Sequence, residues 1–198
     1  MNNPLFYLLM TAAGLYVAKL WNDDRRKPHE RALPGAAAAT TKAIWIAIIG
    51  ALVLLGGETY GENALGIADQ QSKITWLFAV YSIVGAPIIE EMVFRGYLVV
   101  TGKGRAILWA AAIGASFVFA IAHQHLWHWE NKTVVLTLTT KGFFSTGVLF
   151  ATSLWLYVAR FAAWNPTQSL LPCFAGHAAK NAGVVVIKAA TGYMGGLW

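Results

Sequence analysis

The sequence predicts an all-α fold, a polytopic bundle of about six membrane-spanning helices, and three observations lead to this prediction. Hydrophobic residues make up 57% of the 198 residues and charged residues only 12%, whereas a soluble domain carries about 25% charged residues. Apolar runs of about 20 residues, the length that crosses a bilayer as a helix, recur along the chain. The lysines and arginines fall mainly between these runs. We therefore expect one integral-membrane domain over residues 1–198.

Six apolar segments have a suitable length. They cover residues 4–20, 41–57, 75–100, 105–123, 142–164 and 168–190. The first segment lacks the basic n-region of a signal peptide, so we expect it to be retained as a membrane helix.

The segments between the first three spans are charged. Residues 23–31 follow the first span, and the loop expected after the second span holds Glu58, Glu62 and Asp69. Within the third span we expect Pro87 to kink the helix, because proline removes a backbone donor and clashes with the preceding turn.

The later spans are separated by a loop and a turn. A polar, aromatic loop runs from His125 to Lys141, and Asn165-Pro166 predicts a turn before the last span. The lone Cys173 excludes an internal disulfide framework, and we expect it to pack in the interior.

The cations predict how the bundle lies in the membrane. Loops one, three and five hold nine of them: Lys19, Arg25, Arg26, Lys27, Arg31, Lys42, Lys103, Arg105 and Arg160. The opposite side holds three: Lys73, Lys132 and Lys141. This excess predicts that both termini lie outside and the odd-numbered loops in the cytoplasm. Because the net charge of +6 is spread over short gaps, we expect no nucleic-acid partner.

The third span carries two adjacent carboxylates, Glu90 and Glu91, followed by Arg95. On a helix Glu91 and Arg95 are four residues apart, share a face and can pair. Glu90 lies about 100° round the same helix and is free for another role. Charges inside an apolar segment are costly, so they indicate a functional site.

Two further pairs lie in later spans. Phe119 shares a helix face with His123, and His177 shares one with Asn181. In a low-dielectric pocket a carboxylate can serve as a base, a histidine beside it can relay the proton, and a second histidine with an asparagine can stabilise an oxyanion. Lys180 also lies close to His177 in the sequence, and its role stays open.

The ordered set Glu90-Glu91-x-x-x-Arg95, Phe119-x-x-x-His123 and His177-x-x-x-Asn181 resembles the CAAX protease and bacteriocin-processing (CPBP) family of glutamate-type intramembrane endopeptidases. The resemblance covers about residues 75–190. It implies that Glu90 activates water with help from His123, and that His177 and Asn181 stabilise the oxyanion. It also implies that Glu91 and Arg95 hold the helix in place and that Phe119 packs. The candidate catalytic residues are Glu90, Glu91, His123, His177 and Asn181, with Arg95 and Phe119 orienting them.

The resemblance further implies a membrane-anchored protein or peptide substrate, a lipid bilayer around the protein and no cofactor. Six predicted spans are fewer than the eight of the eukaryotic CAAX enzymes, so a preference for prenylated peptides stays open. The short chain favours a prokaryotic plasma membrane.

Two alternatives stay open. Glu90, His123 and His177 are a possible zinc ligand set, although the sequence has no HExxH motif. A transporter or a partner-binding membrane protein is the non-enzymatic alternative, because buried charged residues also carry protons or bind partners.

The predicted depths of these residues differ. At about 1.5 Å per residue, Glu90 and His177 fall near mid-membrane. His123 lies eighteen residues past Arg105, which predicts a position nearer the outer end of its helix.

Overall fold

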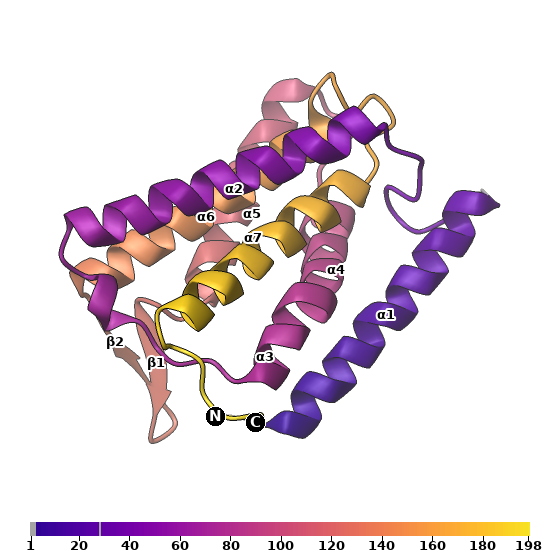
Figure 1. Ribbon diagram of the computed structural model, residues 1–198. Coiled ribbons are helices and arrows are strands. Elements are labelled where there is room, and N and C mark those ends of the chain that lie inside the picture. The colour runs from indigo at the N-terminus through magenta and orange to yellow at the C-terminus, as the bar shows by residue number, and fades with distance from the viewer. Residues whose placement is uncertain (1–2, 28) are drawn as a thin grey trace.

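The computed structural model describes residues 3–27 and 29–198, and within them six long helical segments pass up and down through a bundle (Figure 1). They are α1 (Pro4–Arg26), α2 (Thr41–Ala64), a composite helix (Trp76–Tyr97), α5 (Arg105–Ala122), α6 (Thr140–Phe161) and α7 (Leu171–Ala190). Both ends of the chain lie at the same end of the bundle. The predicted all-α membrane bundle is confirmed.

Five of these helices are long and apolar enough to cross a membrane by length and composition. The sixth, α7, has 20 residues but falls outside this set. It differs from the others in its polar content, which includes His177, Lys180 and Asn181 on its inner part. Helix α7, which carries two of the five predicted catalytic residues, is therefore the one of these six described helices that lacks a sufficiently long apolar stretch.

The first two helices are longer than the sequence predicted. Helix α1 continues to Arg26, and α2 continues to Ala64. Glu58 and Glu62 therefore lie on the last turns of α2, and their predicted place in an exit loop is wrong. Both carboxylates pair with lysines of other helices. These ion pairs stabilise the charged side chains where α2 continues beyond its apolar run.

The composite helix departs from α-helical geometry on both sides of its central segment. It consists of α3 (Trp76–Val80), a π-helical segment (Tyr81–Gly85), α4 (Ala86–Glu91) and a second π-helical segment (Met92–Tyr97). The first π segment closes with the Ala86 N–H donating to the Tyr81 carbonyl, just before Pro87. The expected irregularity at Pro87 thus takes the form of a π turn, the kind of distortion that is frequent at functional sites.

Helix α1 packs against the composite helix through two glycines. A Cβ atom on Gly14 would lie 2.8 Å from the Gly85 Cα, and one on Gly85 would lie 2.9 Å from the Thr11 Cα. The two backbones are in direct contact there, as small residues permit between membrane helices.

The segment between α5 and α6 contains a hairpin that the sequence analysis treated as a loop. Strand β1 (Trp127–Glu130) pairs antiparallel with β2 (Thr133–Leu136). The connecting residues Asn131 and Lys132 have φ values of 48° and 65°. Two successive positive φ values are typical of a type I′ turn, which matches the twist of a hairpin.

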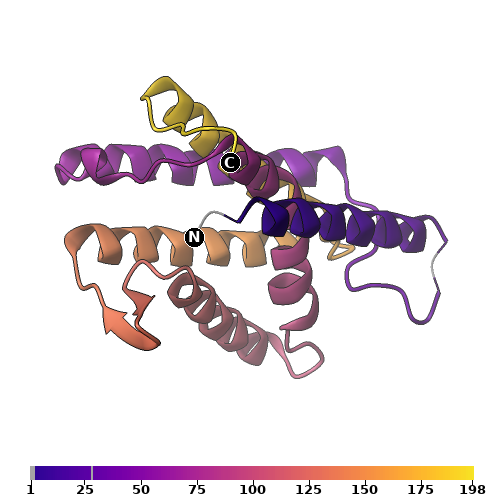
Figure 2. The same cartoon turned by 90° about the horizontal axis from the view of Figure 1, so that it is seen from below.

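Helix α7 lies inside the bundle, against α2, α6 and the composite helix (Figure 1). Helices α2 and α6 run side by side, which Figure 2 shows from below. A Cβ on Gly176 would lie 3.0 Å from the Ala47 carbonyl oxygen, so glycine lets α7 approach α2. Cys173 is fully buried in this core and its thiol donates to the Leu156 carbonyl, in keeping with a packing role.

Candidate active site

The composite helix, α5 and α7 meet at a cavity of about 320 Å³. Its polar lining is Ser82, Glu90, His123, Thr152, His177, Lys180, Asn181 and Lys188. Four predicted catalytic residues from three separate helices therefore line one cavity: Glu90, His123, His177 and Asn181.

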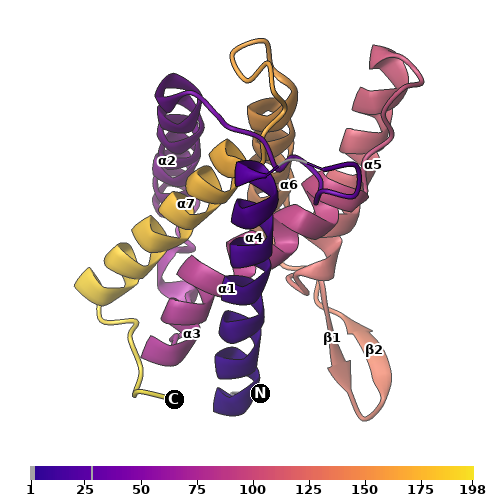
Figure 3. The ribbon, with the colours of Figure 1, turned by 90° about the vertical axis from the view of Figure 1, so that its right-hand side faces the viewer.

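The depth predicted for His123 does not keep it from this cavity. Helix α5 ends at Ala122 and His123 caps it. Figure 3 shows α5 descending obliquely toward the middle of the bundle. Because the helix is tilted, counting residues from Arg105 overestimated the distance between His123 and the other site residues.

Glu91 and Arg95 form the predicted pair. Arg95 Nη1 donates to Glu91 Oε1 at 3.1 Å, and both side chains are fully buried. Arg95 Nη2 also donates to the carbonyl and hydroxyl oxygens of Ser153 on α6, at 2.9 and 2.6 Å. The guanidinium carbon lies 5.0 Å from the ring centroids of both Phe119 and Tyr157. Arg95 thus ties the composite helix to α5 and α6.

Glu91 has a second contact that the sequence analysis missed. His177 Nδ1 lies 2.8 Å from the same Glu91 Oε1. An ionised carboxylate only accepts hydrogen bonds, so Nδ1 is the donor when Glu91 is ionised. This fixes the orientation of the imidazole and turns Nε2 toward Glu90, whose Oε2 is 3.8 Å away. The imidazole of His177 therefore lies between the two adjacent carboxylates.

Glu90 is held less firmly than Glu91. Neither of its oxygens has a hydrogen-bond partner among the described residues, whereas Glu91 Oε1 has two. The Oε2 atoms of both glutamates are buried without a partner within residues 3–27 and 29–198, and such an oxygen carries a desolvation cost that a ligand or water can relieve where the atom can be reached. Glu90 also lines the cavity, whereas Glu91 does not.

His123 and Asn181 complete the polar wall. The Phe119 carbonyl lies 2.8 Å from His123 Nδ1. A carbonyl only accepts hydrogen bonds, so Nδ1 is the donor and Nε2 takes no part in this hydrogen bond. Asn181 Nδ2 donates to the Ser82 carbonyl at 2.6 Å, which uses one of its two amide hydrogens.

Phe119 packs between the charged groups, as predicted. Its ring centroid lies 4.5 Å from that of His123 and 6.5 Å from that of His177. Phe119 also contacts Phe94 edge-on, with 5.0 Å between the two ring centroids. Phe119 is 2% exposed, so its ring is buried among these side chains.

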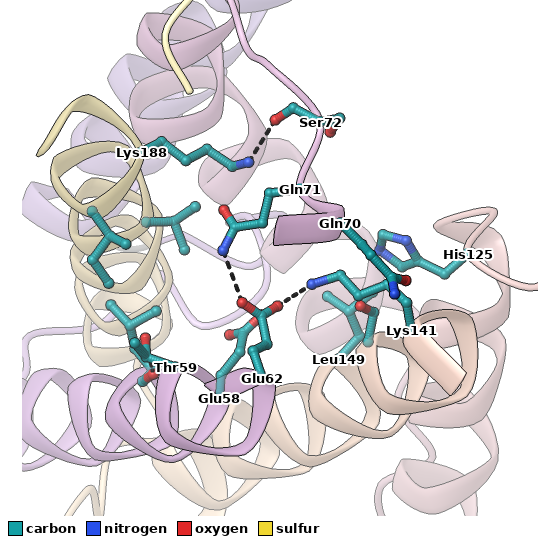
Figure 4. Close-up of a pocket in the computed structure, with 14 residues that line it drawn as sticks. Glu58, Thr59, Glu62, Gln70, Gln71, Ser72, His125, Lys141, Leu149 and Lys188 are labelled. Carbon is teal, nitrogen blue, oxygen red and sulfur yellow. Dashed lines mark hydrogen bonds and ion pairs between the residues drawn. The ribbon is translucent and has the colours of Figure 1, made fainter. Parts of the chain in front are cut away.

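A second cavity of about 280 Å³ adjoins the first, and the two share Leu149, Val184 and Lys188 (Figure 4). Glu62 pairs there with Lys141 and accepts a hydrogen bond from Gln71.

Two lysines of α7 lie close to this second cavity. Lys180 is 5% exposed and pairs with Glu58 at 2.7 Å, which gives it a structural partner that the sequence did not predict. Lys188 donates to the Ser72 carbonyl.

The geometry does not assemble the alternative zinc ligands. Across the described part of the chain, no three His, Cys, Asp or Glu side chains are grouped so that they could hold a metal ion. This applies to Glu90, His123 and His177.

No curated protein and no solved structure matches this chain. A family model does match, over residues 72–183, more than half of the chain and nearly the range of the sequence resemblance. This range contains every predicted site residue, from Glu90 on the composite helix to Asn181 on α7. The chain is an integral-membrane peptidase and belongs to the type II CAAX prenyl endopeptidase Rce1-like family.

Proposed function

We propose that the protein is a glutamate-type intramembrane endopeptidase in which Glu90 activates water to hydrolyse a peptide bond. The observation that supports this most directly is the buried, unpartnered Oε2 atom of Glu90 at the cavity wall, beside His177 Nε2. Glu91 is already bound to Arg95 and His177, so Glu90 is the carboxylate available for proton transfer.

In this mechanism a water molecule lies against Glu90 and His123. Glu90 takes one proton while the water oxygen forms a bond to the scissile carbonyl carbon, and His123 Nε2 accepts a hydrogen bond from the same water. Collapse of the tetrahedral intermediate breaks the C–N bond, and Glu90 returns the proton to the leaving amine. Atoms and charge balance without a nucleophilic serine or cysteine.

His177 and Asn181 stabilise the oxyanion. The Glu91 carboxylate accepts from His177 Nδ1 and orients the ring, and a proton carried on Nε2 can then be donated to developing negative charge. The amide hydrogen of Asn181 that Ser82 does not use is the second donor. This role requires no metal ion.

The substrate is a membrane-anchored protein or peptide. Eight apolar side chains line the cavity beside the catalytic groups: Ile74, Phe78, Ala86, Phe119, Leu149, Leu156, Val184 and Val185. Such a wall favours an apolar segment that lies in or on the bilayer. The membrane is the plasma membrane of a prokaryote, in keeping with the short chain.

The test is a comparison of membrane-protein termini in cells that contain either the wild-type protein or Glu90→Gln at equal abundance. We expect new carboxyl or amino termini only with the wild type, and these termini identify the substrates. Identical termini in both strains would contradict the proposed role of Glu90.

A further inference from the structure

The β1–β2 hairpin has an apolar face and a polar face. Directly paired residues of antiparallel strands point to the same side of the sheet, and alternate residues point to opposite sides. Trp127 pairs with Leu136 and Trp129 with Val134, so these four side chains form one face. The other face consists of His128, Glu130, Thr133 and Val135.

The apolar face is uncovered. Trp129, Val134 and Leu136 are 61%, 53% and 68% exposed. The strands pair with each other and pack extensively against none of the described helices. In Figure 3 the hairpin lies clear of the bundle, below the end of α5. Trp127, at the base of the hairpin, is half-buried. An exposed apolar patch that includes a tryptophan indicates an interaction surface.

The position of the hairpin indicates what covers this face. It connects α5 to α6, two helices that are apolar enough to cross a membrane. In Figures 1 and 3 its turn lies at about the level of the N-terminal end of α1, another such helix. Because the end of a spanning helix marks the membrane surface, the hairpin lies near that surface.

The hairpin backbone further restricts the depth at which the hairpin can lie in the membrane. A two-stranded hairpin leaves the outer N–H and C=O groups of both strands unpaired, and such edges do not occur in the hydrocarbon core. Tryptophan is enriched in the interfacial layer, where its ring is buried and its N–H is hydrated. We propose that the face formed by Trp127, Trp129, Val134 and Leu136 binds phospholipid in the interfacial layer of the bilayer.

The base of the hairpin is fixed to the helix that carries His123. Trp127 Nε1 donates to the Ile121 carbonyl at 2.7 Å. A Cβ on Gly142 would lie 2.5 Å from the His125 carbonyl oxygen, so the chain after His123 rests directly on the first turn of α6. Binding of lipid by the hairpin therefore sets the depth of this side of the catalytic cavity relative to the membrane surface.

Neighbouring residues on opposite faces provide a matched test. Val134→Cys and Leu136→Cys place a nitroxide label on the apolar face, and Thr133→Cys places it on the polar face. Cys173 is fully buried, so the parent protein serves as the labelling blank. Each variant is reconstituted in nanodiscs of phosphatidylcholine and phosphatidylglycerol. Collisions of the label with oxygen, which concentrates in lipid, and with a water-soluble nickel chelate are measured by electron paramagnetic resonance.

We expect a several-fold higher ratio of oxygen to nickel accessibility at positions 134 and 136 than at position 133. Equal ratios on both faces would overturn the proposal. Protection of positions 134 and 136 from both reagents would also overturn it, since that result indicates contact with protein rather than lipid. Neither measurement depends on peptidase activity.

A measurement without labels guards against distortion by the nitroxide. Brominated phospholipids quench tryptophan fluorescence by contact, and Trp129→Phe removes one exposed indole from the apolar face. We expect this variant to lose part of the quenchable fluorescence of the wild type. An unchanged quenchable fraction would place Trp129 outside the lipid and contradict the proposal.

Discussion

At the scale of single residues, the adjacent glutamates have opposite surroundings. The spacing of Glu91 and Arg95 in the sequence predicted their pairing, because residues four apart on a helix share a face. The contact between Glu91 and His177 joins positions 86 residues apart, and no spacing within one helix predicts which face a distant helix turns toward it. The sequence therefore predicted four side chains that meet at one cavity but not the hydrogen bond that orients the imidazole.

This difference predicts different losses in two isosteric variants. Glu90→Gln removes the proposed base, and general-base catalysis is worth about 100- to 10,000-fold in rate. We expect such a loss of peptidase activity in proteoliposomes with an unchanged thermal unfolding midpoint in detergent. Glu91→Gln leaves the buried Arg95 without its carboxylate, and breaking a buried ion pair costs about 3–5 kcal/mol. It should lower the unfolding midpoint markedly. If Glu91→Gln were stable but inactive while Glu90→Gln stayed active, the catalytic and structural roles of the two glutamates would be the reverse of those proposed.

The histidines lead to a prediction about metal dependence. In the proposed mechanism His123 and His177 act through hydrogen bonds, and across the described residues these two histidines and Glu90 are not grouped as a metal site. We therefore expect activity to survive prolonged treatment with EDTA or phenanthroline. The control is a known zinc peptidase treated in the same vesicles. Inactivation that added zinc reverses would favour the alternative ligand set Glu90, His123 and His177.

At the scale of the elements, hydropathy predicted where the helices lie but not where they end. Glu62 at the end of α2 is paired with Lys141, and such a partner distant in sequence cannot be seen from local composition. The hairpin was missed for a similar reason. Its turn uses Asn131-Lys132 with positive φ, without the glycine that usually signals a type I′ turn.

The contact between α1 and the composite helix gives a prediction at this scale. In Gly85→Ala the new Cβ would lie 2.9 Å from the Thr11 Cα and 3.1 Å from the Met10 carbonyl oxygen, so the backbones must separate. We expect a lower unfolding midpoint and a lower activity, because Tyr81 of the same π segment lines the cavity. The control is Gly114→Ala on α5, where a Cβ would meet nothing within 4 Å. Equal behaviour of the two variants would show that the close approach does not contribute to stability.

At the scale of the whole molecule, the polar groups explain why α7 is central. The charged and amide side chains of α7 are directed to partners on other helices: His177 to Glu91, Lys180 to Glu58, and Asn181 to the Ser82 carbonyl. These contacts compensate for the lower apolar content of this helix inside the bundle. These polar residues make α7 unsuited to face lipid, and they also line the cavity. The site and the packing of the bundle therefore depend on the same side chains.

The predicted orientation of the whole bundle depends on the distribution of its cations and on six membrane crossings. Cysteines at exposed positions that leave every charge intact can report it: Thr101→Cys between the composite helix and α5, Thr133→Cys in the hairpin, and Leu197→Cys near the C-terminus. A membrane-impermeant maleimide should label positions 133 and 197 in intact cells and position 101 only after permeabilisation. The buried Cys173 of the parent should stay unlabelled.

The reverse labelling pattern would mean that the cation excess does not set the orientation. Labelling of position 133 but not 197 in intact cells would mean that α7 does not complete a crossing.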